Sequence, residues 1–66
     1  MSTQEMMLAE IVNGNKITVG ERATVYRYTE GGIVARMEGS GEMSQEYALR
    51  PTGLRLALAW IARKAS

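Results

Sequence analysis

The stretch EYALRPTGLRLALAWIARKAS, residues 46–66, decides the fold because it joins an extended run directly to an amphipathic helix. Pro51 has no amide hydrogen for a sheet ladder and disfavours helical backbone at Arg50, so the strand ends before it. Thr52 is a favoured N-cap residue, which predicts a helix that begins at Gly53. A strand and a helix are therefore joined with almost no linker.

The helix predicted after Thr52 is apolar on two sides. Leu56 and Trp60 project away from the stripe that is expected to face the core. A helix that is apolar on two sides is normally buried on both, and a small sheet covers one. We therefore expect a homodimer whose interface contains Leu56, Trp60 and Arg63; alternatively, a hairpin of the same chain covers Trp60. The expected core stripe consists of Leu54, Ala57, Leu58 and Ile61.

The length and composition indicate one small domain, residues 1–66. A chain of this size buries only about 60% of the surface that it exposes when unfolded. The sequence has no cysteine and no histidine, which excludes disulfides and argues against a zinc site. No cofactor or metal is expected, and stability has to come from close packing or from oligomerisation.

The charge balance argues against a uniformly basic protein. Eight basic and seven acidic residues give a net charge of +1, whereas nucleic-acid-binding domains are often strongly basic. The longest apolar run, Leu56–Ala62, is too short to span a bilayer, and no signal-peptide pattern is present. We expect a cytoplasmic protein with no membrane partner and no small-molecule substrate. The basic residues of the C-terminal end are Arg50, Arg55, Arg63 and Lys64.

The segment STQEMMLAEIVNG, residues 2–14, predicts the first helix. Ser2 and Glu5 have the spacing of a capping box, and Asn13 with Gly14 is a typical helix stop. A period of 3.6 residues defines an apolar face. The face that is expected to pack on the core consists of Met7, Leu8, Ile11 and Val12.

Residues 19–29 carry signals for both a helix and a strand. Thr18 and Glu21 have capping-box spacing, and Gly31 is a suitable C-terminal cap, which favours a helix. However, ATVYRYT, residues 23–29, is rich in β-branched and aromatic residues, and EGG offers a tight turn into the next strand. We predict a strand, and a helix over residues 19–29 stays the alternative.

A second hairpin follows, with strands at Ile33–Met37 and Met43–Leu49 around the loop EGSGE, residues 38–42. Alternate residues from Ile33 are expected to pack inward, and those from Val34 to face solvent or a partner. The chain is therefore predicted to be α+β, with an N-terminal helix, a three-stranded antiparallel sheet and a C-terminal helix. The alternative is a compact winged-helix-like arrangement with residues 19–29 helical.

The stretch GGIVARMEGSGEMSQEYALRPTGLRLAL, residues 31–58, resembles the wing hairpin and closing helix of small winged-helix transcription regulators. In that family, a glycine and two aliphatic residues open a hairpin that returns through aromatic-x-Leu-x-Pro-x-Gly to a dimerising helix. The matching residues are Gly32, Ile33, Val34, Tyr47, Leu49, Pro51, Gly53 and the helical run Leu56–Ile61.

The preceding stretch, ITVGERATVYRYTEGG, residues 17–32, is similar to the helix-turn-helix of the same family. Residues 19–23 match the first helix and residues 24–28 the recognition helix. The motif is truncated, because the stretch from Gly20 to Gly31 has room for one helix only.

The resemblance implies a small DNA-associated regulator or accessory protein that binds nucleic acid as a dimer. Affinity would come from phosphate contacts. A dimer would place two such patches about one helical turn apart on the DNA. The predicted nucleic-acid contacts are Lys16, Arg22, Tyr26, Arg27 and Arg36.

The alternative is a protein-binding inhibitor or adaptor, of the type that phages or other mobile elements encode, without nucleic-acid binding. The near-neutral charge and a sheet edge expected to be exposed over residues 22–29 favour this host-protein partner. An enzyme is not expected, because acid–base catalysis would fall to Glu, Lys or Tyr, and no two carboxylates have an informative spacing.

Overall fold

Helix α1 (Thr3–Val12) begins at the predicted capping box. The hydroxyl of Ser2 accepts a hydrogen bond from the amide of Glu5 at 3.1 Å, and the Glu5 carboxylate accepts one from the amide of Ser2 at 3.3 Å. The helix ends at Asn13, and Gly14 follows with φ +92°, a left-handed conformation that glycine adopts readily. The predicted start and stop signals of this helix are confirmed.

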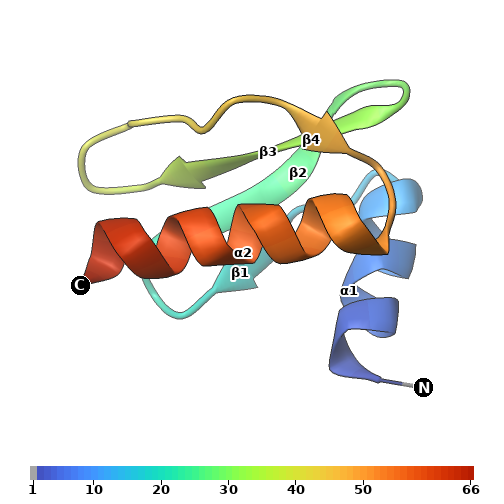
Figure 1. Cartoon of the computed structure of the whole chain (residues 1–66), viewed down its shortest axis with the longest axis horizontal. Helices are drawn as coiled ribbons and strands as arrows, with labels where there is room; N and C mark the ends of the chain where they lie inside the picture. Colours follow the sequence, from blue (N-terminus) through green and yellow to red (C-terminus); the bar gives the residue numbers. More distant parts are fainter. Residues whose placement is uncertain (1) are drawn as a thin grey trace.

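The computed structural model, which describes residues 2–66, contains a four-stranded antiparallel sheet in the order β1-β2-β3-β4 (Figure 1). The helical alternative for residues 19–29 is wrong, because the β-branched and aromatic residues here form a strand that pairs with β3 along its length and with β1 over residues 23–25. The predicted three strands are one too few, because residues 17–19 add a short edge strand. The strands are β1 (Ile17–Val19), β2 (Ala23–Thr29), β3 (Gly32–Met37) and β4 (Tyr47–Ala48).

Two further predictions about the sheet are only partly right. β1 covers residues 23–25 of the edge predicted over residues 22–29, and the pairing with β1 does not extend to the rest of β2. The return strand predicted over Met43–Leu49 is reduced to β4 and one isolated bridge. Its upstream part departs from a regular ladder at Ser44, where the hydroxyl, rather than a backbone carbonyl, accepts a hydrogen bond from the amide of Ala35 at 2.9 Å.

Helix α2 (Pro51–Ala65) starts earlier than predicted. Arg50 is the N-cap and makes no side-chain capping bond, so the predicted cap at Thr52 is wrong. Proline at the first helical position costs no hydrogen bond, because that amide has no partner within the helix. Gly53 lies so close to β4 that a Cβ atom there would overlap the carbonyl oxygen of Ala48. Within residues 2–66, no helix has the length and apolar character needed to cross a membrane.

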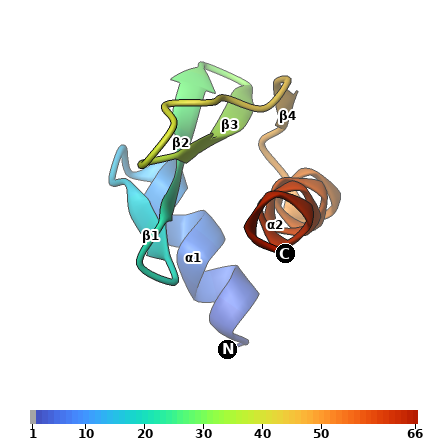
Figure 2. The ribbon, with the colours of Figure 1, turned by 90° about the vertical axis from the view of Figure 1, so that its left-hand side faces the viewer.

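The core lies between the sheet and the two helices (Figure 2). The predicted inward stripe of α2 is confirmed for Leu54, Ala57 and Ile61, and Leu58 is half-buried. Helix α1 contributes one fully buried residue, Ile11, to this core. The buried cluster consists of Ile11, Ala23, Val25, Ile33, Ala35, Leu54, Ala57 and Ile61.

Two apolar residues depart from the predicted faces. Val12 is 47% exposed, because one helical position rotates it by about 100° from the buried Ile11. Val34 is only 2% exposed although alternation places it opposite the core. It pairs with Tyr26 on β2, and the segment between Met43 and Tyr47 returns along its other side.

Candidate interaction surface on helix α2

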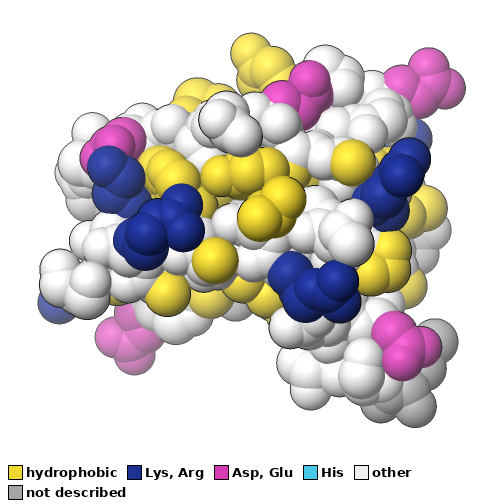
Figure 3. All heavy atoms as spheres, in the orientation of Figure 1, with side chains coloured by type: hydrophobic (Ala, Val, Ile, Leu, Met, Phe, Trp, Pro, Cys, Tyr) yellow, Lys and Arg dark blue, Asp and Glu magenta, His cyan; other side chains and the backbone are white. Residues whose placement is uncertain are grey.

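The exposed side of α2 carries large apolar residues. Leu56 is 55% exposed, because two helical positions rotate it by about 200° from the buried Leu54. Trp60 is half-buried and packs partly against the core. Figure 3 shows hydrophobic side chains gathered along this face, with Lys and Arg side chains toward both ends. We call this the α2 surface; it comprises Leu56, Trp60, Arg50, Arg55, Arg63 and Lys64.

The charges of the α2 surface all have one sign. Residues 50–66 contain four basic residues and no acidic residue. Arg63 and Lys64 lie in the last turn, where the helix dipole favours cations. The same dipole favours acidic residues in the first turn, which has none. The helix dipole therefore does not stabilise the basic residues near the N-terminal end of α2, which are Arg50 and Arg55.

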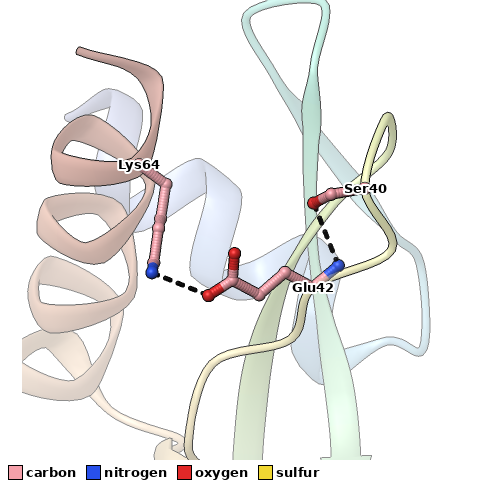
Figure 4. Close-up of polar contacts among 3 residues, drawn as sticks. All are labelled: Ser40, Glu42 and Lys64. Carbon is pink, nitrogen blue, oxygen red and sulfur yellow. Dashed lines mark hydrogen bonds and ion pairs between the residues drawn. The ribbon is translucent and has the colours of Figure 1, made fainter.

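Lys64 connects α2 to the loop between β3 and β4 (Figure 4). Its Nζ lies 2.7 Å from Oε2 of Glu42 and 5.7 Å from the centroid of the Trp60 ring. The hydroxyl of Ser40 accepts a hydrogen bond from the amide of Glu42 at 3.2 Å. The Lys64 and Glu42 side chains are 41% and 49% exposed, and ion pairs this open to water contribute little to stability.

The outer face of the sheet, which points away from the helices, brings together three of the predicted nucleic-acid contacts. Lys16 Nζ lies 5.3 Å from the centroid of the Tyr26 ring, within cation–π range. Tyr26 pairs with Val34, so alternation places Arg36 on the same face one diagonal step away. Thr24 lies on the same face and donates a hydrogen bond to the carboxylate of Glu38 at 3.0 Å. The carboxylate of Glu38 therefore adds a negative charge to this face.

The other two predicted nucleic-acid contacts lie elsewhere. The guanidinium of Arg27 donates to the carbonyls of Glu30, at 2.7 and 3.1 Å, and of Val12, at 3.0 Å, so it ties a hairpin turn to the end of α1. Arg22 stands in the turn between β1 and β2, beside a cleft of about 360 Å³. The five residues therefore do not form one continuous surface. The apolar residues of the cleft are Val19, Met37, Ile61 and Ala65.

The three predicted dimer residues share one side of α2. Spacings of four and three residues place Leu56, Trp60 and Arg63 along the same helical face, and both Leu56 and Arg63 are exposed. Trp60 packs partly against the core of its own chain. The homodimer stays a prediction.

Sequence reasoning missed the contact between Glu42 and Lys64. The position of Lys64 four residues after Trp60 is a local signal for stacking along a helix. Glu42 lies in a loop far away in the sequence, and no local pattern pairs it with α2.

Comparisons with known proteins identified no relative. No protein-family model matches the chain, and no similar protein was found among curated proteins or solved structures. The resemblance to winged-helix regulators therefore stays a prediction, and function has to be inferred from the surfaces described above.

Proposed function

We propose that this chain is a small binding protein without catalytic activity, an adaptor or inhibitor that docks a protein partner on the α2 surface. The observation that carries the proposal is an apolar centre, formed by exposed Leu56 and half-buried Trp60, with basic side chains toward both ends of this face. Protein interfaces commonly combine an apolar core with a polar rim, and they favour Trp and Arg.

The charge of the α2 surface favours an acidic partner. The only ion pair of this surface among the described residues joins Lys64 to Glu42, so Arg50, Arg55 and Arg63 offer their charge to a partner. A second copy of the chain would bring the same excess of basic residues to the interface, and like charges disfavour association. An acidic protein segment therefore fits this surface better than the homodimer does.

A peptide titration tests the proposed function. The probe is a synthetic amphipathic helical peptide with leucines along one face and glutamates on both sides of that face. We expect it to change the fluorescence of Trp60, the single tryptophan of the chain. Its affinity should fall as salt is raised from low to physiological concentration, because salt screens exposed charges.

The matched control for this titration is the same peptide with lysines in place of the glutamates. It keeps the leucine face and reverses the charge, so we expect much weaker binding. If neither peptide binds at low ionic strength, or if both bind equally well, the proposed acidic partner is wrong.

Nucleic-acid binding is the second candidate function, and the grouping of Lys16, Tyr26 and Arg36 on the outer face of the sheet favours it. Phosphate contacts would make such binding strongly salt-dependent. A gel shift with duplex DNA should then be lost in the double variant Lys16→Gln, Arg36→Gln. No shift at low salt, or a shift that this variant leaves unchanged, would exclude the outer face as a DNA site.

A further inference from the structure

We infer that Glu42 occupies, in the free protein, the place of a partner carboxylate, and that the partner is an amphipathic helix with acidic residues beside its apolar stripe. This inference rests on the proposed function and adds both the form of the partner and an internal competitor for its site. The acidic segment replaces Glu42 at Lys64 while its apolar residues cover Leu56 and Trp60.

The position of Glu42 shows which chemistry the α2 surface accepts. Its carboxylate is held at 2.7 Å by an ammonium group that also lies over the ring of Trp60. Lys64 thus binds a carboxylate directly beside the apolar centre of the surface. A partner that buries Trp60 brings its flanking side chains to the same place, where a carboxylate is the group that complements Lys64.

The Glu42 side chain can leave without unfolding the loop. The loop backbone is fixed independently, because the amide of Met37 donates to the carbonyl of Glu42 and the amide of Gly41 donates to the carbonyl of Met37, both at 2.8 Å. The carboxylate lies at the end of a flexible side chain that is 49% exposed. Exchange for another carboxylate therefore requires only a rotamer change and the loss of a weak ion pair.

The shape of the surface favours a helical partner. Leu56 and Trp60 are four residues apart on one helix, so they form a short ridge along the axis of α2. Helices pack by fitting such i, i+4 ridges into the grooves of another helix. Amphipathic helices present apolar residues with this same period, and recognition of such a helix through its apolar face is a recurrent binding mode.

The variant Glu42→Gln tests the competition. Removal of the internal carboxylate frees Lys64, so the glutamate-bearing peptide should bind about two- to fivefold more tightly, the range expected for loss of one exposed ion pair. The control is Glu30→Gln, which changes the net charge equally in the turn between β2 and β3. It should change the affinity less than Glu42→Gln does. In a Lys64→Ala background, the gain from Glu42→Gln should disappear.

The outcomes separate this inference from the proposed function. Equal gains from Glu42→Gln and Glu30→Gln, or a gain that persists with Lys64→Ala, would overturn the internal competitor but leave the α2 surface as the docking site. Failure of the peptide to bind any variant would overturn the proposed function itself. If Glu42→Gln strengthens binding of duplex DNA and not of the peptide, the surface takes phosphates and a helical protein partner is wrong.

Discussion

A Gly53→Ala variant is expected to lose about 2 kcal/mol of unfolding free energy, because the steric cost of overpacking exceeds the gain in helix propensity. The new methyl group would overlap the carbonyl oxygen and the amide nitrogen of Ala48. Relief requires α2 to move away from β4, which loosens the packing of Leu54, a fully buried residue next in sequence. Helix propensity alone predicts the opposite sign, a gain of about 1 kcal/mol for alanine over glycine.

Urea unfolding followed by circular dichroism measures this effect. Gly39→Ala is the matched control, because a methyl group there meets no atom within 4 Å and the backbone is not left-handed. The control should stay within about 0.5 kcal/mol of the parent. If Gly53→Ala proves more stable than the parent, the close approach between α2 and β4 is wrong.

A Leu56→Glu variant is expected to bind the glutamate-bearing peptide more than tenfold more weakly than the parent does. Burial of a leucine side chain contributes about 1.5–3 kcal/mol, and the new carboxylate also repels the acidic peptide. Leu56 is 55% exposed, so its replacement should leave the unfolding free energy nearly unchanged. Calorimetry or Trp60 fluorescence gives the affinity, and circular dichroism confirms that the variant is folded.

Met6→Glu is the control for this experiment. Met6 is 57% exposed on α1, so the variant makes the same change of charge at an equally open apolar position away from α2. It should retain the parent affinity within about twofold, a difference of roughly 0.4 kcal/mol. Size-exclusion chromatography adds a second comparison. If the parent is a dimer and Leu56→Glu a monomer in the absence of peptide, the occupant of the surface is a second copy.

Local signals in the sequence were sufficient for most of the fold. The capping box at Ser2 and Glu5, the β-branched run in residues 23–29 and the proline at position 51 each act on neighbouring backbone, so pattern reading identified them. The sequence-based prediction was wrong where tertiary contacts determine the local structure. Strand β1 is too short to stand out by composition and forms by pairing with β2.

The start of α2 shows why local rules were insufficient there. Thr52 has the side chain of a good cap, yet Arg50 takes the N-cap position, because the chain turns immediately after β4. The amide of Arg50 donates to the carbonyl of Ala48 at 2.9 Å, which holds this tight turn. The need for glycine at position 53 follows from that approach to β4, and the sequence contains no local sign of it.

The candidate surface could be predicted in part. Helical periodicity placed Leu56 and Trp60 outside the core stripe, which is right for Leu56, whereas Trp60 also packs partly against the core. The basic end of the chain was visible in the sequence. The position of the Glu42 carboxylate beside these residues could not be predicted, because Glu42 and Lys64 are 22 positions apart in the sequence. Likewise, only the fold shows that Arg27 donates hydrogen bonds to backbone carbonyls, whereas Lys16 and Arg36 lie together on the outer face of the sheet.

The most direct test of the central claim, that the α2 surface is the docking site, is a map of amide chemical-shift changes as the glutamate-bearing peptide is added to the isotope-labelled protein. We predict that the largest changes fall on residues 56–64 and on Glu42, with little change on the outer face of the sheet. Changes centred instead on Lys16, Tyr26 and Arg36, with α2 unaffected, would contradict it.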